Sequence, residues 1–194
     1  MKTLLFKPFD RFSETALITV GLIAAVIGSY LAHLFQVRFD GALDLHFSPD
    51  LVSLETAFIE NGINIACLTL FSFIAGKLIN KRVRLVDLLA VSLIARIPFY
   101  LVSLMNSSNA LSAASNEVLE AVRAESLESI SSSSMMLLGV LALVSILVLV
   151  WYIALLWRGF KVATNAKGST HIIYFIGALL VAEVVSKLLI VQLL

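Results

Sequence analysis

The hydrophobic positions of this chain gather into five unbroken runs, separated by shorter polar segments. The runs cover residues 15–36, 55–78, 86–105, 135–157 and 171–194. A helix needs roughly 20 apolar residues to cross the hydrocarbon of a bilayer, where it bonds its own backbone groups. The runs lack the polar and apolar alternation of a transmembrane β-strand. The pattern predicts an all-α, polytopic membrane helix bundle with five transmembrane helices in a single transmembrane domain, residues 1–194.

The segment before the first run predicts an element that lies in the membrane interface. Residues 2–13 mix charged residues with large apolar ones, among them Leu5, Phe6, Phe9 and Phe12. Such a mixture is typical of an amphipathic segment with its apolar side chains in the headgroup zone.

Two loops between the runs differ in character. Residues 37–54 contain Gly41 and several acidic residues, and we expect an irregular, solvated loop. Residues 106–134 are rich in Ser, Asn and Ala, and Val118, Leu119 and Val122 recur in them at helical spacing. This spacing predicts a short acidic helix on the outer surface. We interpret this longer loop as a connector, with a partner-binding role as the alternative.

Composition agrees with lipid as the solvent of most of the chain. Hydrophobic residues make up 60% of the sequence and charged residues 14%, and the mean hydropathy is +0.99. Soluble domains carry about 25% charged residues because their surfaces face water. No basic patch with interleaved aromatic residues is present, which excludes nucleic acid. The expected partner is the lipid bilayer.

Basic residues divide unevenly among the segments that link the runs, the ends of the runs included. The N-terminal segment and the links before the third and fifth runs hold ten: Lys2, Lys7, Arg11, Lys77, Lys81, Arg82, Arg84, Arg158, Lys161 and Lys167. The other two loops hold Arg38 and Arg123. Because Lys and Arg are enriched in cytoplasmic loops, this bias predicts a cytoplasmic N-terminus and a C-terminus outside.

Four charged residues fall deep inside the runs, away from their ends: Glu60, Arg96, Glu183 and Lys187. An ionised group at the bilayer centre costs on the order of 3 kcal/mol, so these side chains should face the interior and neutralise one another. The helical rise places Arg96 about 15 Å and Glu183 about 18 Å from the same membrane face. We therefore expect the ion pairs Arg96–Glu183 and Glu60–Lys187. Glu183 and Lys187 are also one helical turn apart, in the favourable order.

Further polar residues accompany these charges. Asn61 and Asn64 lie in the second run, and Tyr100 follows Arg96 by one helical turn. Pro98 lacks a backbone N–H and is expected to kink the third helix. Two interpretations remain open. In the one we favour, the polar cluster joins helices through hydrogen bonds worth roughly 0.6 kcal/mol each; in the other, it lines a path for ions, protons or lipid headgroups.

Small residues recur at every fourth position of the first run. They form two rows, Gly21, Ala25 and Ser29, and Ala24, Gly28 and Ala32. Small residues at this spacing let helix backbones approach closely. We expect this face to pack within the monomer, and a homodimer through the same face is the alternative.

Four short stretches carry a resemblance to a known family. They are Lys7-Pro8-Phe9-Asp10-Arg11-Phe12, Arg38-Phe39-Asp40-Gly41, Ile94-Ala95-Arg96-Ile97-Pro98, and Trp151-Tyr152 followed by Trp157-Arg158-Gly159-Phe160. Together they resemble bacterial members of the Yip (Ypt-interacting protein domain) family. The likeness covers nearly the whole chain and implies five spans, a cytoplasmic N-terminus and location in the bacterial inner membrane.

The resemblance implies the fold and topology but no GTPase partner. Eukaryotic relatives are associated with small GTPases of the Rab type and with Golgi vesicle traffic. This chain is expected to lack the long cytoplasmic N-terminal region that those relatives carry. Arg96 and Pro98 are the positions that match residues characteristic of the family, and the resemblance implies no role for either.

Enzyme and metal chemistry find little support in the sequence. It contains no His-Glu-x-x-His, no Gly-x-Ser-x-Gly and no phosphate-binding glycine loop. His33, His46 and His171 lie near opposite faces of the membrane and cannot converge on one metal. His46 with Asp44 and Asp50 could hold a cation weakly, but we favour a solvated acidic loop. We expect no catalytic residue, no cofactor and no metal.

Two functional hypotheses follow. The favoured one is a non-catalytic, Yip-like membrane protein that organises membrane or partner proteins through its helix bundle. The alternative is a small transporter or channel that uses Glu60, Arg96, Glu183 and Lys187. An odd number of spans does not divide into the two inverted halves that many transporters have.

Overall fold

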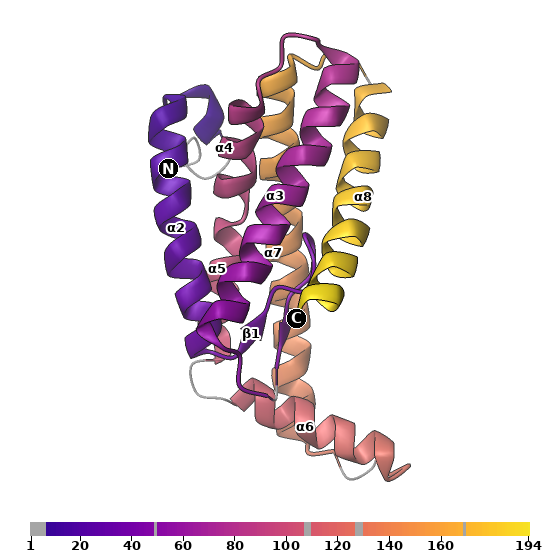
Figure 1. Ribbon diagram of the computed structural model, residues 1–194. Coiled ribbons are helices and arrows are strands. Elements are labelled where there is room, and N and C mark those ends of the chain that lie inside the picture. The colour runs from indigo at the N-terminus through magenta and orange to yellow at the C-terminus, as the bar shows by residue number, and fades with distance from the viewer. Residues whose placement is uncertain (1–6, 49, 107–109, 127–129, 169) are drawn as a thin grey trace.

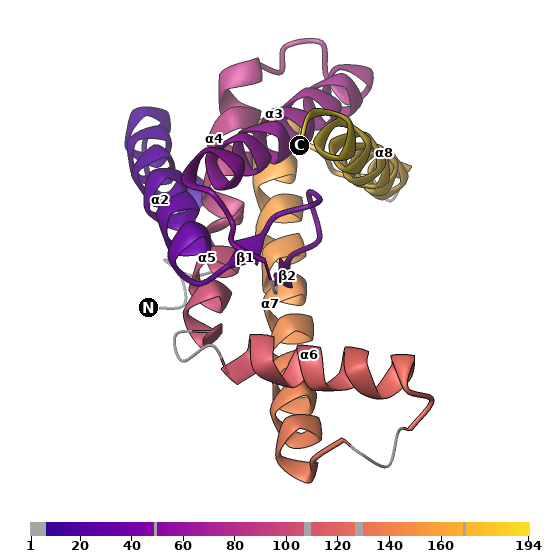
Figure 2. The same cartoon turned by 60° about the horizontal axis from the view of Figure 1, so that its bottom comes forward.

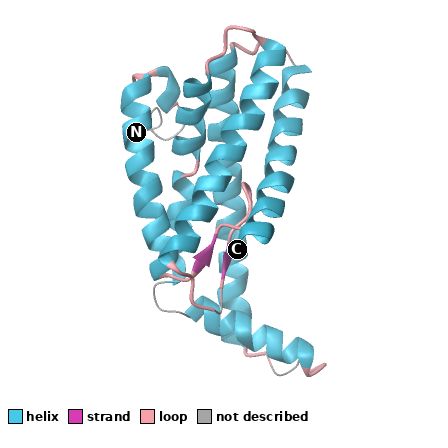
Figure 3. Cartoon of the chain, viewed as in Figure 1, coloured by secondary structure: helices cyan, strands magenta, loops and turns pink. Residues whose placement is uncertain are grey.

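The computed structural model describes residues 7–48, 50–106, 110–126, 130–168 and 170–194, which fold into a bundle of long helices (Figure 1). The helices are α2 (Glu14–Leu34), α3 (Leu54–Ile79), α4 (Leu85–Ala95), α5 (Ile97–Ser103), α6 (Ala110–Arg123), α7 (Ser132–Thr164) and α8 (Thr170–Leu193), with the 3₁₀ turns η1 (Pro8–Asp10) and η2 (Leu104–Asn106). Among the residues described, strands are confined to β1 (Val37–Arg38) and β2 (His46–Phe47), at one end of the bundle (Figure 3).

The predicted all-α bundle with five membrane-spanning helices is confirmed. Five helical segments are long and apolar enough to cross a bilayer: α2, α3, α4–α5 with η2, α7 and α8. The serines Ser13, Ser53 and Ser131 begin three of them, each accepting a hydrogen bond from the backbone N–H three residues on. Such N-caps satisfy amides that have no partner within the helix. The outer faces expose large apolar side chains, as a surface that contacts lipid requires.

The third span forms the centre of the bundle. In its most apolar window 72% of residues are buried, against 6–33% in the other four spans. The helix breaks at Arg96, where α4 ends and α5 begins, two residues before Pro98. Pro98 has no N–H to donate to the preceding turn, and the Phe99 N–H closes a tighter turn onto the Arg96 carbonyl at 3.0 Å.

Helix α7 is longer than the sequence suggested. Its 33 residues extend over roughly 50 Å at 1.5 Å per residue, against a predicted span of 135–157. Its first half continues past the other helices, and α6 lies across it (Figures 1 and 2). The predicted surface helix is therefore present as α6. Its buried face, however, is formed by Leu111, Ala114 and Ala121, whereas Leu119 and Val122 are exposed.

The two ends of the bundle differ in charge. The α3–α4 link, the α7–α8 link and η1 lie at one end, called here the basic end, and the β-strands, η2 and α6 lie at the other (Figure 1). At the basic end η1 is fastened to the bundle, because Asp10 pairs with Arg158 at 2.6 Å. Phe9 packs at Gly159, where an added Cβ would lie 3.0 Å from its ring. Phe9 is therefore buried between helices and does not face lipid; Leu5 and Phe6 lie outside the described residues.

Candidate functional site

The loop between α2 and α3 turns back into the bundle. Its strands pair antiparallel, with Val37 opposite Phe47 and Arg38 opposite His46. Val37, Phe39 and Ala42 are fully buried. We call residues 37–47 the hairpin; in Figure 2 it lies in front of α7, below α3 and α8 in the view. The expectation of a solvated, irregular loop is therefore wrong for this part of the segment.

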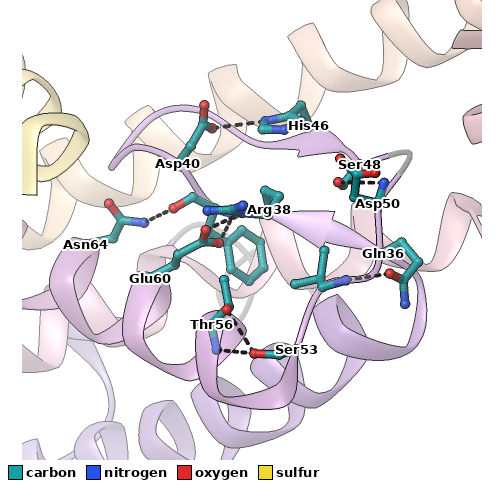
Figure 4. Close-up of polar contacts among 12 residues, drawn as sticks. Gln36, Arg38, Asp40, His46, Ser48, Asp50, Ser53, Thr56, Glu60 and Asn64 are labelled. Atoms are coloured by element: carbon teal, nitrogen blue, oxygen red, sulfur yellow. Dashed lines mark hydrogen bonds and ion pairs between the residues drawn. The ribbon is translucent and has the colours of Figure 1, made fainter. Parts of the chain in front are cut away.

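Helix α3 holds the first half of the hairpin through a buried carboxylate (Figure 4). Glu60, with no exposed surface, accepts hydrogen bonds from Arg38 Nε and from the Phe39 N–H, the latter at 2.8 Å. One turn on, Asn64 Nδ2 donates to the Phe39 carbonyl at 2.6 Å. Glu60 and Asn64, on one face of α3, thus bind the backbone N–H and the carbonyl of Phe39, the two groups that a neighbouring strand would bind.

Helix α8 holds the tip of the hairpin. Glu183 accepts from the Leu43 N–H at 2.6 Å, and Ser186 Oγ accepts from the Ala42 N–H at 3.0 Å. Lys187 Nζ lies 2.7 Å from Asp44 and 3.3 Å from Glu183. The tip passes close to this helix.

Glycine is required at one position of the tip. A Cβ at Gly41 would lie 2.5 Å from Glu183 Oε1, a separation that real Cβ contacts do not reach. Since the Glu183 carboxylate is bound by Leu43 and Lys187, it has little freedom to move away. The absence of a side chain at Gly41 therefore allows the hairpin to pack closely against α8.

Arg96 lies at the helix break, in the middle of this arrangement. Its Nε donates to Asn61 Oδ1 at 3.0 Å and its Nη1 to the Ala42 carbonyl at 3.2 Å. Its guanidinium carbon lies 5.3 Å from the Phe39 ring centre and 5.8 Å from that of Phe99, in the range of cation–π contacts. Among the described residues, no carboxylate forms an ion pair with it.

Both acceptors of Arg96 have a second donor. Tyr100 Oη donates to Asn61 Oδ1 at 3.1 Å, and Tyr152 Oη donates to the Ala42 carbonyl at 2.8 Å. Arg96 also retains a free donor, since its Nη2 is buried without a hydrogen-bond partner in the described part of the chain. The positive charge of Arg96 is thus stabilised by carbonyl dipoles and aromatic rings.

The structure brings all the predicted cluster residues onto the hairpin or around Arg96, but the predicted ion pairs are wrong. Glu60 pairs with Arg38 and not with Lys187, and Arg96 does not pair with Glu183. Of the expected contacts, Glu183–Lys187 is present. The hairpin supplies the missing partners Arg38 and Asp44, which sequence reasoning had assigned to solvent.

The small-residue face of α2 packs inside the monomer. An added Cβ at Gly21 would lie 2.6 Å from Leu93 Cβ, and one at Gly28 would lie 2.3 Å from the Tyr100 ring. Asn61 Nδ2 donates to the Ala25 carbonyl at 3.2 Å and to Ser29 Oγ at 2.9 Å. This face joins α2 to α4 and α5 and extends the hydrogen-bond network to Arg96.

His46 and Asp40 form a partly exposed ion pair of the hairpin. His46 Nδ1 lies 3.4 Å from Asp40 Oδ1. The Asp40 carboxylate raises the pKa of His46 above 6.5, against the opposing effect of burial. Burial by itself would raise the pKa of Asp40, but the nearby His46 and Lys187 lower it below 3.8. In the part of the chain that the structure describes, no three His, Cys, Asp or Glu residues gather in metal-binding geometry.

We expect stability to fall as this pair loses its charge. A His whose pKa is raised by folding stabilises fully below its unfolded pKa, and that contribution is lost as pH rises through the folded value. The melting temperature in detergent should therefore fall slightly as the pH rises from about 6.5 through the raised pKa of His46. His46→Gln should flatten this dependence. A wild-type melting temperature with the same pH dependence as the variant would contradict the assignment.

Comparison with known proteins adds no relative. No family model, no characterised protein and no solved structure shows significant similarity to this chain.

Proposed function

We propose that the chain is a non-catalytic, Yip-like integral membrane protein that organises membrane or partner proteins through its helix bundle. The observation that carries this proposal is the way the interior charges are bound. Glu60 and Arg96 have no exposed surface, and both bind atoms of this chain. A hairpin held in place by α3 and α8 favours a rigid bundle over a solvated passage.

The proposal includes an orientation and a location. The basic end faces the cytoplasm, as the Lys and Arg bias of the loops favours, and the hairpin and C-terminus face outward. By the resemblance, the membrane is the bacterial inner membrane. A C-terminal alkaline phosphatase fusion should be active and a C-terminal fluorescent-protein fusion dark. A fluorescent C-terminal fusion would contradict this orientation.

Flux in reconstituted liposomes tests the function. For the purified protein, proton, ion and lipid-headgroup flux should equal that of protein-free vesicles, because the polar cluster is closed by the hairpin. Flux above this background, lost in Glu183→Gln with the protein still folded, would defeat the organising role.

One observation favours a transporter or channel as the second candidate. Arg96 Nη2 and Asn64 Oδ1 are buried without hydrogen-bond partners among the described residues. Ionisable residues that face the interior of a helix bundle mark ion or substrate paths in many membrane proteins.

Replacement of Arg96 distinguishes the two candidates. Arg96→Met should change the free energy of unfolding by less than about 1 kcal/mol, since it removes the desolvation cost of the charge together with its hydrogen bonds and leaves no carboxylate unpaired. Asn61 and Ala42 keep the tyrosine donors described above. If this variant folds normally and abolishes a flux that the wild type shows, the second candidate is correct. Calorimetry in detergent and the liposome assay provide the two measurements.

A further inference from the structure

An apolar groove opens on the side of the bundle, away from the polar cluster. It has a volume of about 350 Å³ and lies between η1, α2, α4–α5 and α7. Val20 and Leu101 form its exposed margins, and Leu17, Ile94 and Leu155 its buried floor. The volume is within the range of roughly 300–1,000 Å³ typical of sites for small ligands.

The groove follows from the break in the third span. Ile94, Ile97, Pro98 and Leu101 all line it, and they lie on both sides of the joint between α4 and α5. These positions follow the i, i+3, i+4, i+7 stripe of one helix face, and the break at Arg96 bends that face. The space beside the joint is left open toward the membrane.

The position of the groove selects a lipid as its occupant. Pro8 and Phe12 close it at the basic end, and it reaches Leu101, seven residues and about 10 Å beyond Ile94. It therefore runs from the level of the interface into the hydrocarbon, as one acyl chain does. A soluble ligand would have to cross lipid to reach it.

Charge at the mouth favours an anionic headgroup. Lys7 and Arg11 directly precede Pro8 and Phe12 in the sequence, and both are exposed. The nearest acidic residue in sequence, Asp10, is already paired with Arg158. Basic residues near a membrane surface attract anionic lipids by about 1 kcal/mol each.

We propose that this groove binds one acyl chain of an anionic phospholipid from the leaflet at the basic end, with its phosphate at Lys7 and Arg11. This inference deepens the proposed function: the role of the bound lipid, to help organise the membrane around the bundle, rests on that function. Flux through the bundle would contradict the proposed organising role but not lipid binding in the groove. Absence of lipid binding by the wild-type protein would contradict only the proposal about the groove.

Native mass spectrometry of the full chain, released from micelles with added phosphatidylglycerol or phosphatidylcholine, tests the proposal. The wild type should retain one phosphatidylglycerol, and Val20→Trp should weaken this binding at least roughly ten-fold because the ring fills the groove. Val26→Trp is the matched control: both valines are on α2 and both are 54% exposed, but Val26 does not line the groove. Leu101→Trp fills the groove from α5 and should repeat the effect.

Headgroup selection is tested at the mouth. Lys7→Gln with Arg11→Gln should reduce the preference for phosphatidylglycerol over phosphatidylcholine roughly ten-fold. Lys81→Gln with Arg82→Gln, two exposed residues at the same end, should not. Three results would each overturn the proposal. The variants Val20→Trp and Val26→Trp could retain the lipid equally, or the wild type could retain both lipids equally. In the third, Val20→Trp would lose a dimer and not a lipid.

Discussion

Glu60→Ala should lower the free energy of unfolding by about 3 kcal/mol, near the lower end of the cost of breaking a buried ion pair. The change removes the carboxylate that binds both Arg38 and the Phe39 N–H. Arg38 can regain some water, because 31% of its side chain is exposed, but the Phe39 amide cannot. Denaturant titration in mixed micelles, followed by circular dichroism, provides the measurement.

Glu55→Ala is the matched control for this prediction. Glu55 lies on the same helix but is exposed at its first turn, so its loss should cost only a few tenths of a kcal/mol. Replacing both partners, Arg38→Met with Glu60→Met, should recover the part of the loss that comes from the unpaired arginine. Equal losses for Glu60→Ala and Glu55→Ala would show that the carboxylate does not hold the hairpin.

Gly28→Ala should destabilise the bundle by about 2 kcal/mol through overpacking, although alanine is the better helix former by about 1 kcal/mol. The new methyl group would lie 2.3 Å from the Tyr100 ring. Tyr100 is buried and bonded to Asn61, so the ring cannot move aside without disrupting the polar cluster. The same denaturant titration measures the effect.

Gly62→Ala separates helix propensity from packing. Gly62 is in α3, where an added Cβ meets nothing within 4 Å. This variant should therefore gain up to about 1 kcal/mol of stability. The two alanine substitutions are expected to have opposite signs. A stabilised Gly28→Ala protein would place Tyr100 elsewhere and contradict the packing of α2 on α5.

Most of the architecture could be predicted because each apolar run meets the requirements of lipid by itself, without any contact to a distant part of the chain. A run of apolar residues predicts a span wherever it occurs, and the small residues of α2 indicate close packing without naming the neighbour. The break at Pro98 follows from its missing N–H. These inferences need no knowledge of distant parts of the chain.

The partners of the buried charges could not be predicted in the same way. Lys187 binds Asp44 across 143 residues, and Glu183 binds the Leu43 amide across 140. Counting charges only within the spans left the hairpin out and led to the pairs Arg96–Glu183 and Glu60–Lys187.

One local signal for the hairpin was present. Val37 and Phe39 flank Arg38 at the two-residue period of a strand with one buried face, and both are buried in the structure. The acidic residues that follow suggested a solvated loop and concealed this alternation. An apolar alternation inside a short polar loop of a membrane protein therefore deserves consideration as a buried segment.

Hydrogen exchange of the hairpin amides, measured by mass spectrometry in lipid nanodiscs, tests most directly whether the hairpin completes the interior of the bundle. The amides of Phe39, Ala42 and Leu43 each donate to a side chain of α3 or α8. Peptides covering these residues should exchange as slowly as those of α4, and Glu60→Ala should accelerate the exchange at Phe39. Complete exchange of this segment at the earliest time point, in a folded wild-type protein, would show that the loop lies in water and that the buried charges are bound in some other way.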